Sequence, residues 1–192
     1  EEQSKNNSDL RNLIQEYHDG LLLFEVSKRE VWDVAAADTK GLEQWYKSHK
    51  DTYKWEKPRF KGFVFHCKNA KSAKAVNKML KKFGEGDWRK ELKQQFNKDS
   101  VTVSVSGPYL CSQGENATID AYAFKIGTKV NMPKGYVMTG VSGKVMKQPK
   151  SYLDVKAQVT TDYQQECEKK WVEKLRKQFT YSVNEDVLKT VK

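Results

Sequence analysis

The chain has 192 residues, 38% hydrophobic and 31% charged, with a net charge of +10 from 35 basic and 25 acidic residues. Five Trp, nine Tyr and eight Phe residues can fill a core, so the composition excludes a disordered chain. Lysine is spread along the sequence without a zinc-finger, helix-turn-helix or RNP-like motif, which argues against nucleic acid as a partner.

No apolar run is long enough to span a membrane, and no secretory signal is present. The polar start, residues 1–8, resembles a cut end, so we interpret the chain as part of a longer protein. Cys67, Cys111 and Cys167 lack metal-ligand spacing, so neither a metal site nor a cofactor is predicted. Cys67 and Cys167 are expected in the core, and the disulfide state of the three cysteines stays open.

The first predicted element is an amphipathic helix from about Asp9 to Phe24 or beyond. Ser27 and Glu30 match a capping box, which predicts a new or restarted helix over 28–37, and a further helix is expected over 41–49. The apolar residues of the first helix recur at helical spacing, at Leu10, Leu13, Ile14, Tyr17, Leu21 and Phe24.

The middle of the chain changes to a mixed pattern. Arg59–Cys67 carries apolar residues on both faces, which predicts a strand buried on two sides. Helices are predicted over 70–83, over 87–96 with Asp87 as cap, and over 117–124. A second strand is expected over 100–110, broken by Gly107-Pro108 and followed by a loop over 111–116. Residues 136–146 predict two short strands or one bent hairpin, because Gly140 and Gly143 interrupt them.

The last predicted helix is long and begins at Ser151 or Asp154. Residues 181–183 are expected to be extended, and Asn184 to cap a short final helix. The long helix and the first helix each need a surface against which to bury, either each other or a partner. The apolar stripe of the long helix comprises Val155, Val159, Tyr163, Cys167, Trp171, Leu175 and Phe179.

Two terminal segments carry a family resemblance. EYHDGLLLFEVSKREVW, followed by DTKGLEQWYKSHKDTYKW, resembles the segment that leads into the parvulin-type (PpiC-type) prolyl isomerase domain of SurA-like periplasmic chaperones. SYLDVKAQVTTDYQQECEKKWVEKLRKQFTYSVNEDVLKTV resembles the C-terminal helix that returns to the chaperone module. The order of strands and helices between them resembles a parvulin core.

The resemblance implies an α+β fold, with a parvulin-like small antiparallel sheet and helices, flanked by N- and C-terminal helices that pack together as a helical lobe. It implies an N-terminal helical arm at 1–57, a degenerate parvulin-like domain at 58–150, and a C-terminal helix at 151–192 that returns to the arm. It also places the chain in the periplasm, or cell envelope, of a Gram-negative bacterium.

The catalytic pattern of the family is missing. An active parvulin carries one histidine on its first strand and one on its last, and here Gly62 and Val137 stand at the matching positions. No catalytic residue is therefore predicted. The candidate peptide-binding residues, by the same resemblance, are Tyr109, Asn116, Ile119 and Phe124.

Three histidines remain as other candidates. His66 lies four residues from Gly62 on the same strand face and is the alternative acid–base group, although a structural histidine fits as well. His18 is expected on the polar face of the first helix. His49 is expected to end a helix, where a cationic side chain complements the helix dipole.

These observations predict a chaperone or foldase module that binds unfolded or partly folded exported polypeptides, without prolyl isomerase activity. An active but atypical isomerase is one alternative. A structural or adaptor domain that binds a partner protein through its terminal helices is another. Exposure of the two apolar stripes would indicate an interface, and mutual burial would indicate a core. The clients and the oligomeric state stay open.

Overall fold

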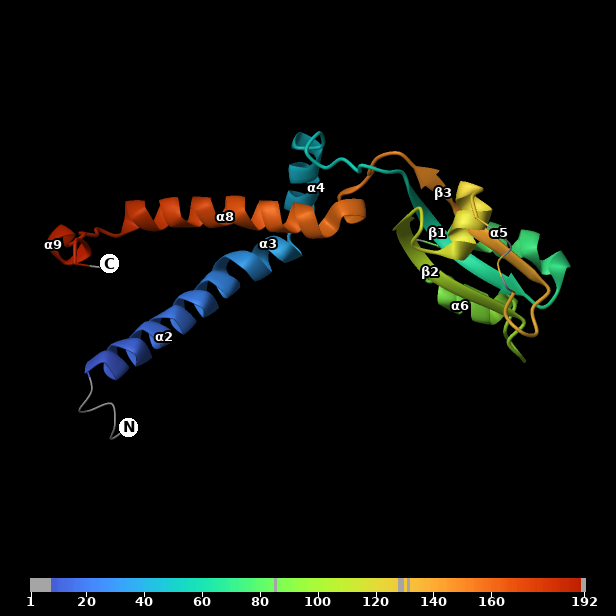
Figure 1. The fold of residues 1–192 in the computed structure, drawn as a ribbon, viewed down its shortest axis with the longest axis horizontal. Coiled ribbons are helices and arrows are strands. Elements are labelled where there is room, and N and C mark those ends of the chain that lie inside the picture. Colours follow the sequence, from blue (N-terminus) through green and yellow to red (C-terminus); the bar gives the residue numbers. More distant parts are fainter. Residues whose placement is uncertain (1–7, 85, 128–129, 131, 191–192) are drawn as a thin grey trace. The chain divides into compact units, whose positions relative to one another are not determined.

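The computed structural model in Figure 1 describes residues 8–84, 86–127, 130 and 132–190. The fold is α+β, as predicted. The chain forms two compact units. The helical unit combines the residues up to Tyr53 with those from Ser151 onwards, and the sheet unit comprises Lys54–Lys150.

The sheet unit is built on a three-stranded antiparallel sheet in the order β2-β1-β3. The central strand, β1 (Arg59–Cys67), lies between β2 (Val103–Ser112) and β3 (Met138–Met146). The predicted burial of β1 on both faces is confirmed, because every residue from Gly62 to Phe65 is buried. Alternate residues of β1 therefore serve two different cores.

One face of the sheet is covered by α5 (Ala73–Phe83), which follows a 3-10 turn, η2 (Ala70–Ser72), and by α6 (Trp88–Gln95). The helical spacing of the apolar residues in α5 directs one face of the helix onto the sheet. The buried cluster comprises Phe63, Phe65, Cys67, Ala73, Val76, Met79, Leu80, Trp88 and Val103.

The opposite face is covered by α7 (Ala117–Ile119) and a short π-helical turn, η3 (Asp120–Phe124). Here the even-numbered residues of β1 meet β2 and α7. Both faces of the small sheet are thus closed by apolar packing. The second buried cluster comprises Phe60, Val64, Cys111 and Ile119.

The predicted break at Gly107-Pro108 is wrong, because β2 runs through both residues to Ser112. The register shifts between Gly62 and Val64, whose partners on β2 are Tyr109 and Ser106. Two residues of β2 therefore face one residue of β1, which is a β-bulge. Since β2 is an edge strand, a proline in this bulge removes no necessary ladder hydrogen bond.

The predicted hairpin over 136–146 is also wrong, because β3 is one continuous strand. Gly140 lies opposite Phe65, and a Cβ atom at Gly140 would approach Cζ of that ring to 2.6 Å. The glycine therefore makes room for an aromatic ring on the neighbouring strand and does not mark a turn.

The N-terminal part of the helical unit is α2 (Ser8–Ser27), a π-helical turn η1 (Lys28–Trp32), α3 (Asp33–Ala37) and α4 (Thr39–Ser48). The predicted capping box at Ser27 is wrong. Ser27 has helical dihedral angles, φ −59° and ψ −40°, and its side chain caps nothing. The chain continues from α2 into η1 without a break. Inside a continuous helix the backbone N–H groups are already bonded, so none is free to donate to the Ser27 side chain.

The C-terminal part is a 3-10 turn η4 (Tyr152–Val155), α8 (Lys156–Gln178) and the short α9 (Glu185–Leu188). Ser151 and Asp154 form a capping box at the start of η4, and Asn184 caps α9 through Val187 N–H. These starts agree with the predictions from sequence.

Helix α8 packs against η1, α3 and α4. Tyr163 donates a hydrogen bond to Asp38 at 2.8 Å, and Gly41 makes room for it, since a Cβ atom there would lie 2.2 Å from the hydroxyl. The Gly41 N–H, and then Tyr163, hold the pKa of the Asp38 carboxyl below its ordinary value. Gln164 adds a hydrogen bond to Trp32 O at 2.9 Å.

The prediction that the first helix packs along the last is wrong for most of α2. Figure 1 shows α2 (blue) leaving the packed part of the helical unit at η1. Leu13, Tyr17 and Leu21 are 61%, 69% and 51% exposed. Of the stripe on α8, Val155 and Val159 are buried, the positions from Tyr163 to Leu175 are half-buried, and Phe179 is exposed.

Candidate functional site

Gly62 stands where the resemblance predicts a first catalytic histidine. It faces Tyr109 on β2 and Gly143 on β3. A Cβ atom at Gly62 would lie 2.2 Å from Ser142 O and 2.6 Å from Gly143 Cα. Both contacts are to backbone, which cannot rotate away, so this strand has no room for any side chain at position 62.

Val137 stands where the second histidine is predicted, and it lies just before β3. Its side chain is 57% exposed, and its N–H donates to Cys67 O at 3.0 Å. Val137 is therefore level with Cys67, the last residue of β1. Cys67 lies five residues beyond Gly62, a separation of roughly 17 Å along a strand. The structure does not bring the two degenerate positions together.

Three of the four candidate peptide-binding residues gather on one face of the sheet. Tyr109 and Phe124 are half-buried and pack against the cluster that contains Ile119. Ile119 itself is fully buried, so a peptide cannot reach it in this conformation. These side chains therefore form a core.

Asn116 has a structural role that explains its polarity. Its side-chain oxygen accepts hydrogen bonds from Thr118 N–H at 3.0 Å and Ile119 N–H at 3.1 Å. Asn116 is the N-cap of α7, a position that favours a short polar side chain. This candidate peptide-binding residue thus caps a helix.

His66 lies on β1 with its Nδ1 atom 2.8 Å from Thr139 Oγ1 and its ring 5.8 Å from Tyr136. Burial lowers the pKa of this imidazole from its ordinary value. No carboxylate or thiol hydrogen-bonds to it among the described residues. The arrangement is that of a neutral histidine in a sheet, and it does not form an acid–base pair.

The other two histidines lie in the helical unit. His18 is exposed beside Asp19 on α2, at 3.2 Å. His49 is the C-cap of α4, and its Nδ1 atom lies 3.0 Å from Trp45 O. Both occupy the kind of position predicted from the sequence.

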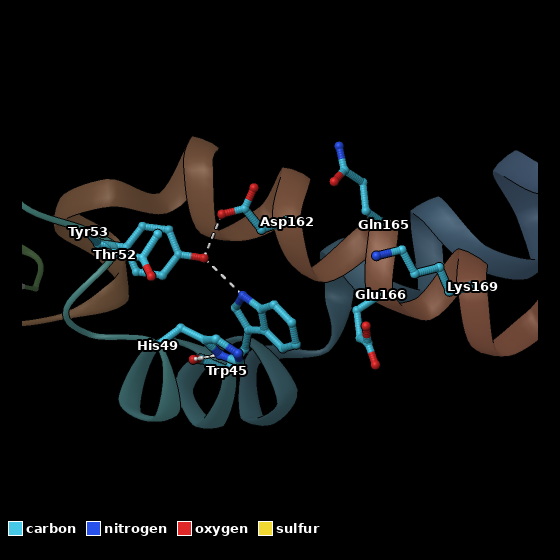
Figure 2. Close-up of a pocket in the computed structure, with 8 residues that line it drawn as sticks. All are labelled: Trp45, His49, Thr52, Tyr53, Asp162, Gln165, Glu166 and Lys169. Carbon is cyan, nitrogen blue, oxygen red and sulfur yellow. Dashed lines mark hydrogen bonds between the residues drawn. The ribbon is translucent and has the colours of Figure 1, made fainter.

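Sequence reasoning missed a hollow in the helical unit. It has a volume of about 230 Å³ and lies between the end of α4, the segment after it, and α8 (Figure 2). Its lining combines aromatic rings with charged and amide side chains. The lining residues are Trp45, His49, Thr52, Tyr53, Asp162, Gln165, Glu166 and Lys169.

A chain of hydrogen bonds fixes one wall of this hollow (Figure 2). Trp45 Nε1 donates to Tyr53 OH at 2.9 Å, and Tyr53 OH donates to Asp162 Oδ2 at 2.7 Å. Trp45 also stacks on His49 with ring centroids 3.8 Å apart. Residues that are over 100 positions apart in sequence are thereby held in one rigid arrangement.

Two ionisable groups of the hollow, Tyr53 and Glu166, are held by neighbouring side chains. Burial, and then the hydrogen bond to Asp162, raise the pKa of Tyr53 to about 12, so this phenol stays protonated and is neither a base nor a nucleophile. Glu166 pairs with Lys170 at 3.1 Å. Within the described part of the chain, no group of three His, Cys, Asp or Glu residues could hold a metal ion.

An exposed apolar surface of the helical unit lies on α2. We call it the α2 apolar surface. Four consecutive residues, Leu21–Phe24, are each more than half exposed. Because consecutive residues point around a helix, this run spreads apolar surface over much of its circumference. The surface comprises Leu13, Ile14, Tyr17, Leu21, Leu22, Leu23, Phe24 and Val26, all at least 46% exposed.

Comparison of the chain with protein-family models, with curated proteins and with solved structures gives no match. None of the described helices is long and apolar enough to cross a membrane.

Proposed function

We propose that the protein is a chaperone-type module of a bacterial envelope that binds unfolded or partly folded polypeptides without catalysing prolyl isomerisation. The α2 apolar surface is the observation that carries this proposal. A contiguous exposed apolar patch on a folded chain marks a place where another chain binds. The SurA-like resemblance of EYHDGLLLFEVSKREVW, which includes Leu21–Phe24, supports the same function.

The energetics of such a surface suit weak and unselective binding. Covering the exposed half of one leucine contributes about 1 kcal/mol. Several such contacts must first offset the entropy lost on association, which takes most of the gain. A surface of leucines offers no hydrogen bonds that would select one client sequence, so binding follows apolar content.

Three features of the sheet unit support the absence of catalysis. Gly62 cannot carry a side chain, Val137 lies level with the last residue of β1, and the His66 ring hydrogen-bonds to a threonine hydroxyl. Rotation about a prolyl bond is accelerated by a preorganised pocket, and a neutral lone imidazole does not supply one.

Suppression of aggregation tests the chaperone function. An unfolded, aromatic-rich β-barrel protein is diluted from denaturant with and without the chain, and light scattering is recorded. The variant Leu21→Gln/Leu22→Gln/Leu23→Gln keeps good helix formers on α2 and removes the apolar run. We expect it to need at least about fivefold more protein for the same suppression, as three apolar contacts are lost.

The matched control removes three exposed apolar residues elsewhere. Val101, Val145 and Leu153 are 57%, 41% and 58% exposed. Their triple replacement by Gln should leave suppression unchanged. Equal suppression by the α2 variant and the unaltered chain would remove the α2 apolar surface from the mechanism.

A proline-peptide isomerisation assay tests the catalytic half of the proposal. We expect the rate to stay at the uncatalysed value at every protein concentration. Strong acceleration that disappears in His66→Ala would instead establish the alternative, an active isomerase with an atypical pocket.

The exposure of α2 also favours a second candidate, an adaptor domain that docks one folded partner. The two functions differ in selectivity. A chaperone binds many unfolded chains and releases them when they fold, whereas an adaptor forms a complex of fixed stoichiometry. Size-exclusion chromatography with light scattering, applied to native and denatured forms of the same client, separates them.

A further inference from the structure

The excess of positive charge lies in the sheet unit, although basic residues occur along the whole sequence. Lys54–Lys150 contains 20 basic and seven acidic residues, a net charge of +13, whereas the remainder contains 15 basic and 18 acidic residues, a net charge of −3. The net charge of the sheet unit thus exceeds that of the whole chain, which is +10. An electric field of this kind attracts anionic partners.

Three lysines of the sheet unit converge on one hollow. Lys90 and Lys93 lie three residues apart on α6, and Lys98 follows the end of the helix. Together with Gln94 they line a hollow of about 480 Å³. Side chains three apart on a helix are neighbours on its surface, so this is a local concentration of ammonium groups.

These lysines have no acidic partner in the part of the chain that the structure describes. None of them forms an ion pair there, and Glu91, the acidic residue on α6, accepts a hydrogen bond from Gln95 at 2.7 Å. Like charges at this spacing destabilise a helix. A bound anion would relieve that repulsion.

The surroundings favour one class of anion. Trp88 is buried and Phe83 and Phe96 are half-buried, so this part of the unit has no exposed aromatic ring on which a nucleic-acid base could stack. Among the described residues of 71–84 and 86–98, no large apolar side chain is exposed that could anchor in a lipid surface. Flexible, point-like ammonium groups suit carboxylates at variable spacing.

From these observations we infer that Lys90, Lys93 and Lys98 form a binding site for acidic, Asp- or Glu-rich segments of polypeptides. The inference deepens the proposed function, on which it rests, because it adds a second class of client segment. Apolar segments bind to α2 and acidic segments bind to the sheet unit. A client with both kinds of segment would be held by both units, which raises its affinity.

The test uses fluorescein-labelled poly-L-glutamate and fluorescence anisotropy. We expect binding that weakens as salt is raised through the physiological range, because the contacts are exposed ion pairs. Lys90→Gln/Lys93→Gln/Lys98→Gln should weaken the Kd about tenfold. The same variant should not lower the thermal midpoint, since it removes a repulsion and no stabilising contact.

The matched control removes the same charge from the same unit. Lys134, Lys144 and Lys147 are exposed, and their triple replacement by Gln should change the Kd less than about twofold. An equal loss in both variants would overturn the site and leave only a general effect of net charge.

Two further arms test the class of partner. Phosphatidylglycerol vesicles and a single-stranded oligonucleotide are titrated under the same conditions. If either binds more tightly than poly-L-glutamate and is lost in the same lysine variant, the assignment to acidic polypeptide is wrong.

The experiment is separable from the test of the proposed function. The Leu21→Gln/Leu22→Gln/Leu23→Gln variant should bind poly-L-glutamate as well as the unaltered chain does. If the unaltered chain does not suppress aggregation, the proposed function fails and the lysine site stands on its own binding curve. If poly-L-glutamate never binds, the lysine site fails alone.

Discussion

The two units of this protein differ in how they bury their apolar residues. The sheet unit buries them on both faces of a small sheet, in clusters centred on Phe63 and Phe60. The helical unit buries residues where α8 meets η1, α3 and α4, and then leaves the α2 apolar surface exposed. The sheet unit has two apolar clusters and only scattered exposed apolar residues among those described, whereas the helical unit leaves a consecutive run of them exposed on α2.

The charges follow the same division. The sheet unit carries a net +13 and the helical unit carries −3. The net charge of the sheet unit attracts anionic partners, whereas the exposed leucines of the helical unit can use the hydrophobic effect. The comparison therefore assigns two kinds of contact to two parts of one chain.

The strongest test of this contrast compares one large side chain from each unit. Phe60 is 1% exposed in the sheet and Leu22 is 53% exposed on α2. Phe60→Ala should lower the free energy of unfolding by about 3–5 kcal/mol through lost burial and the cavity left behind. Leu22→Ala should change it by less than about 0.5 kcal/mol, as surface substitutions do.

Urea unfolding followed by tryptophan fluorescence and circular dichroism measures both effects. We expect the larger loss of unfolding free energy in Phe60→Ala, and this order is what supports the contrast between the units. A cost for Leu22→Ala close to that of Phe60→Ala would show that α2 is packed in solution, and the contrast between the units would fail.

The second test places histidine at the two degenerate positions. Gly62→His should cost about 3 kcal/mol, because its Cβ atom would meet the backbone of β3 at Ser142 and Gly143. Val137→His should cost almost nothing, since that side chain points to solvent. Neither variant, nor the double variant, should accelerate prolyl isomerisation.

Thermal unfolding and the isomerisation assay report on this pair. Catalysis that appears when both histidines are present would show that the two positions can meet. That result would contradict the separation of Gly62 and Val137 along β1.

Much of the fold follows from sequence periodicity. The spacing of Val76, Met79 and Leu80 places α5 on the sheet, and the unbroken apolar run of 62–65 places β1 at its centre. The signal fails where a residue type has two uses. Gly140 is read as a turn and makes room for Phe65, and Ser27 is read as a cap and lies inside a helix.

The candidate sites were less accessible to sequence reasoning. A helical stripe such as Leu13, Tyr17 and Leu21 shows that a face is apolar, and it does not show what covers that face. Only the consecutive run Leu21–Phe24 signals an exposed surface, because no single flank of a helix can bury it. The hollow beside Trp45 joins residues more than 100 positions apart, for which periodicity has no signal.

The third test concerns the hydrogen bonds that Tyr53 makes within the helical unit. Tyr53→Phe removes a hydroxyl that accepts from Trp45 Nε1 and donates to Asp162. The free energy of unfolding at neutral pH should fall by about 1–2 kcal/mol, since two partners each lose a hydrogen bond. Tyr181→Phe, at a site 70% exposed, is the control and should have no effect.

The pH dependence distinguishes this hydrogen-bonded phenol from a merely packed ring. The pKa of Tyr53 is raised in the folded protein from 10.0 to about 12, so the unfolded chain loses this proton first. The stabilisation is therefore complete below pH 10 and declines as the pH rises towards 12. The difference in stability between the unaltered chain and Tyr53→Phe should shrink over that interval in urea unfolding experiments. A difference that stays constant from neutral pH to pH 12 would mean that the ring alone, and not its hydroxyl, joins α4 to α8.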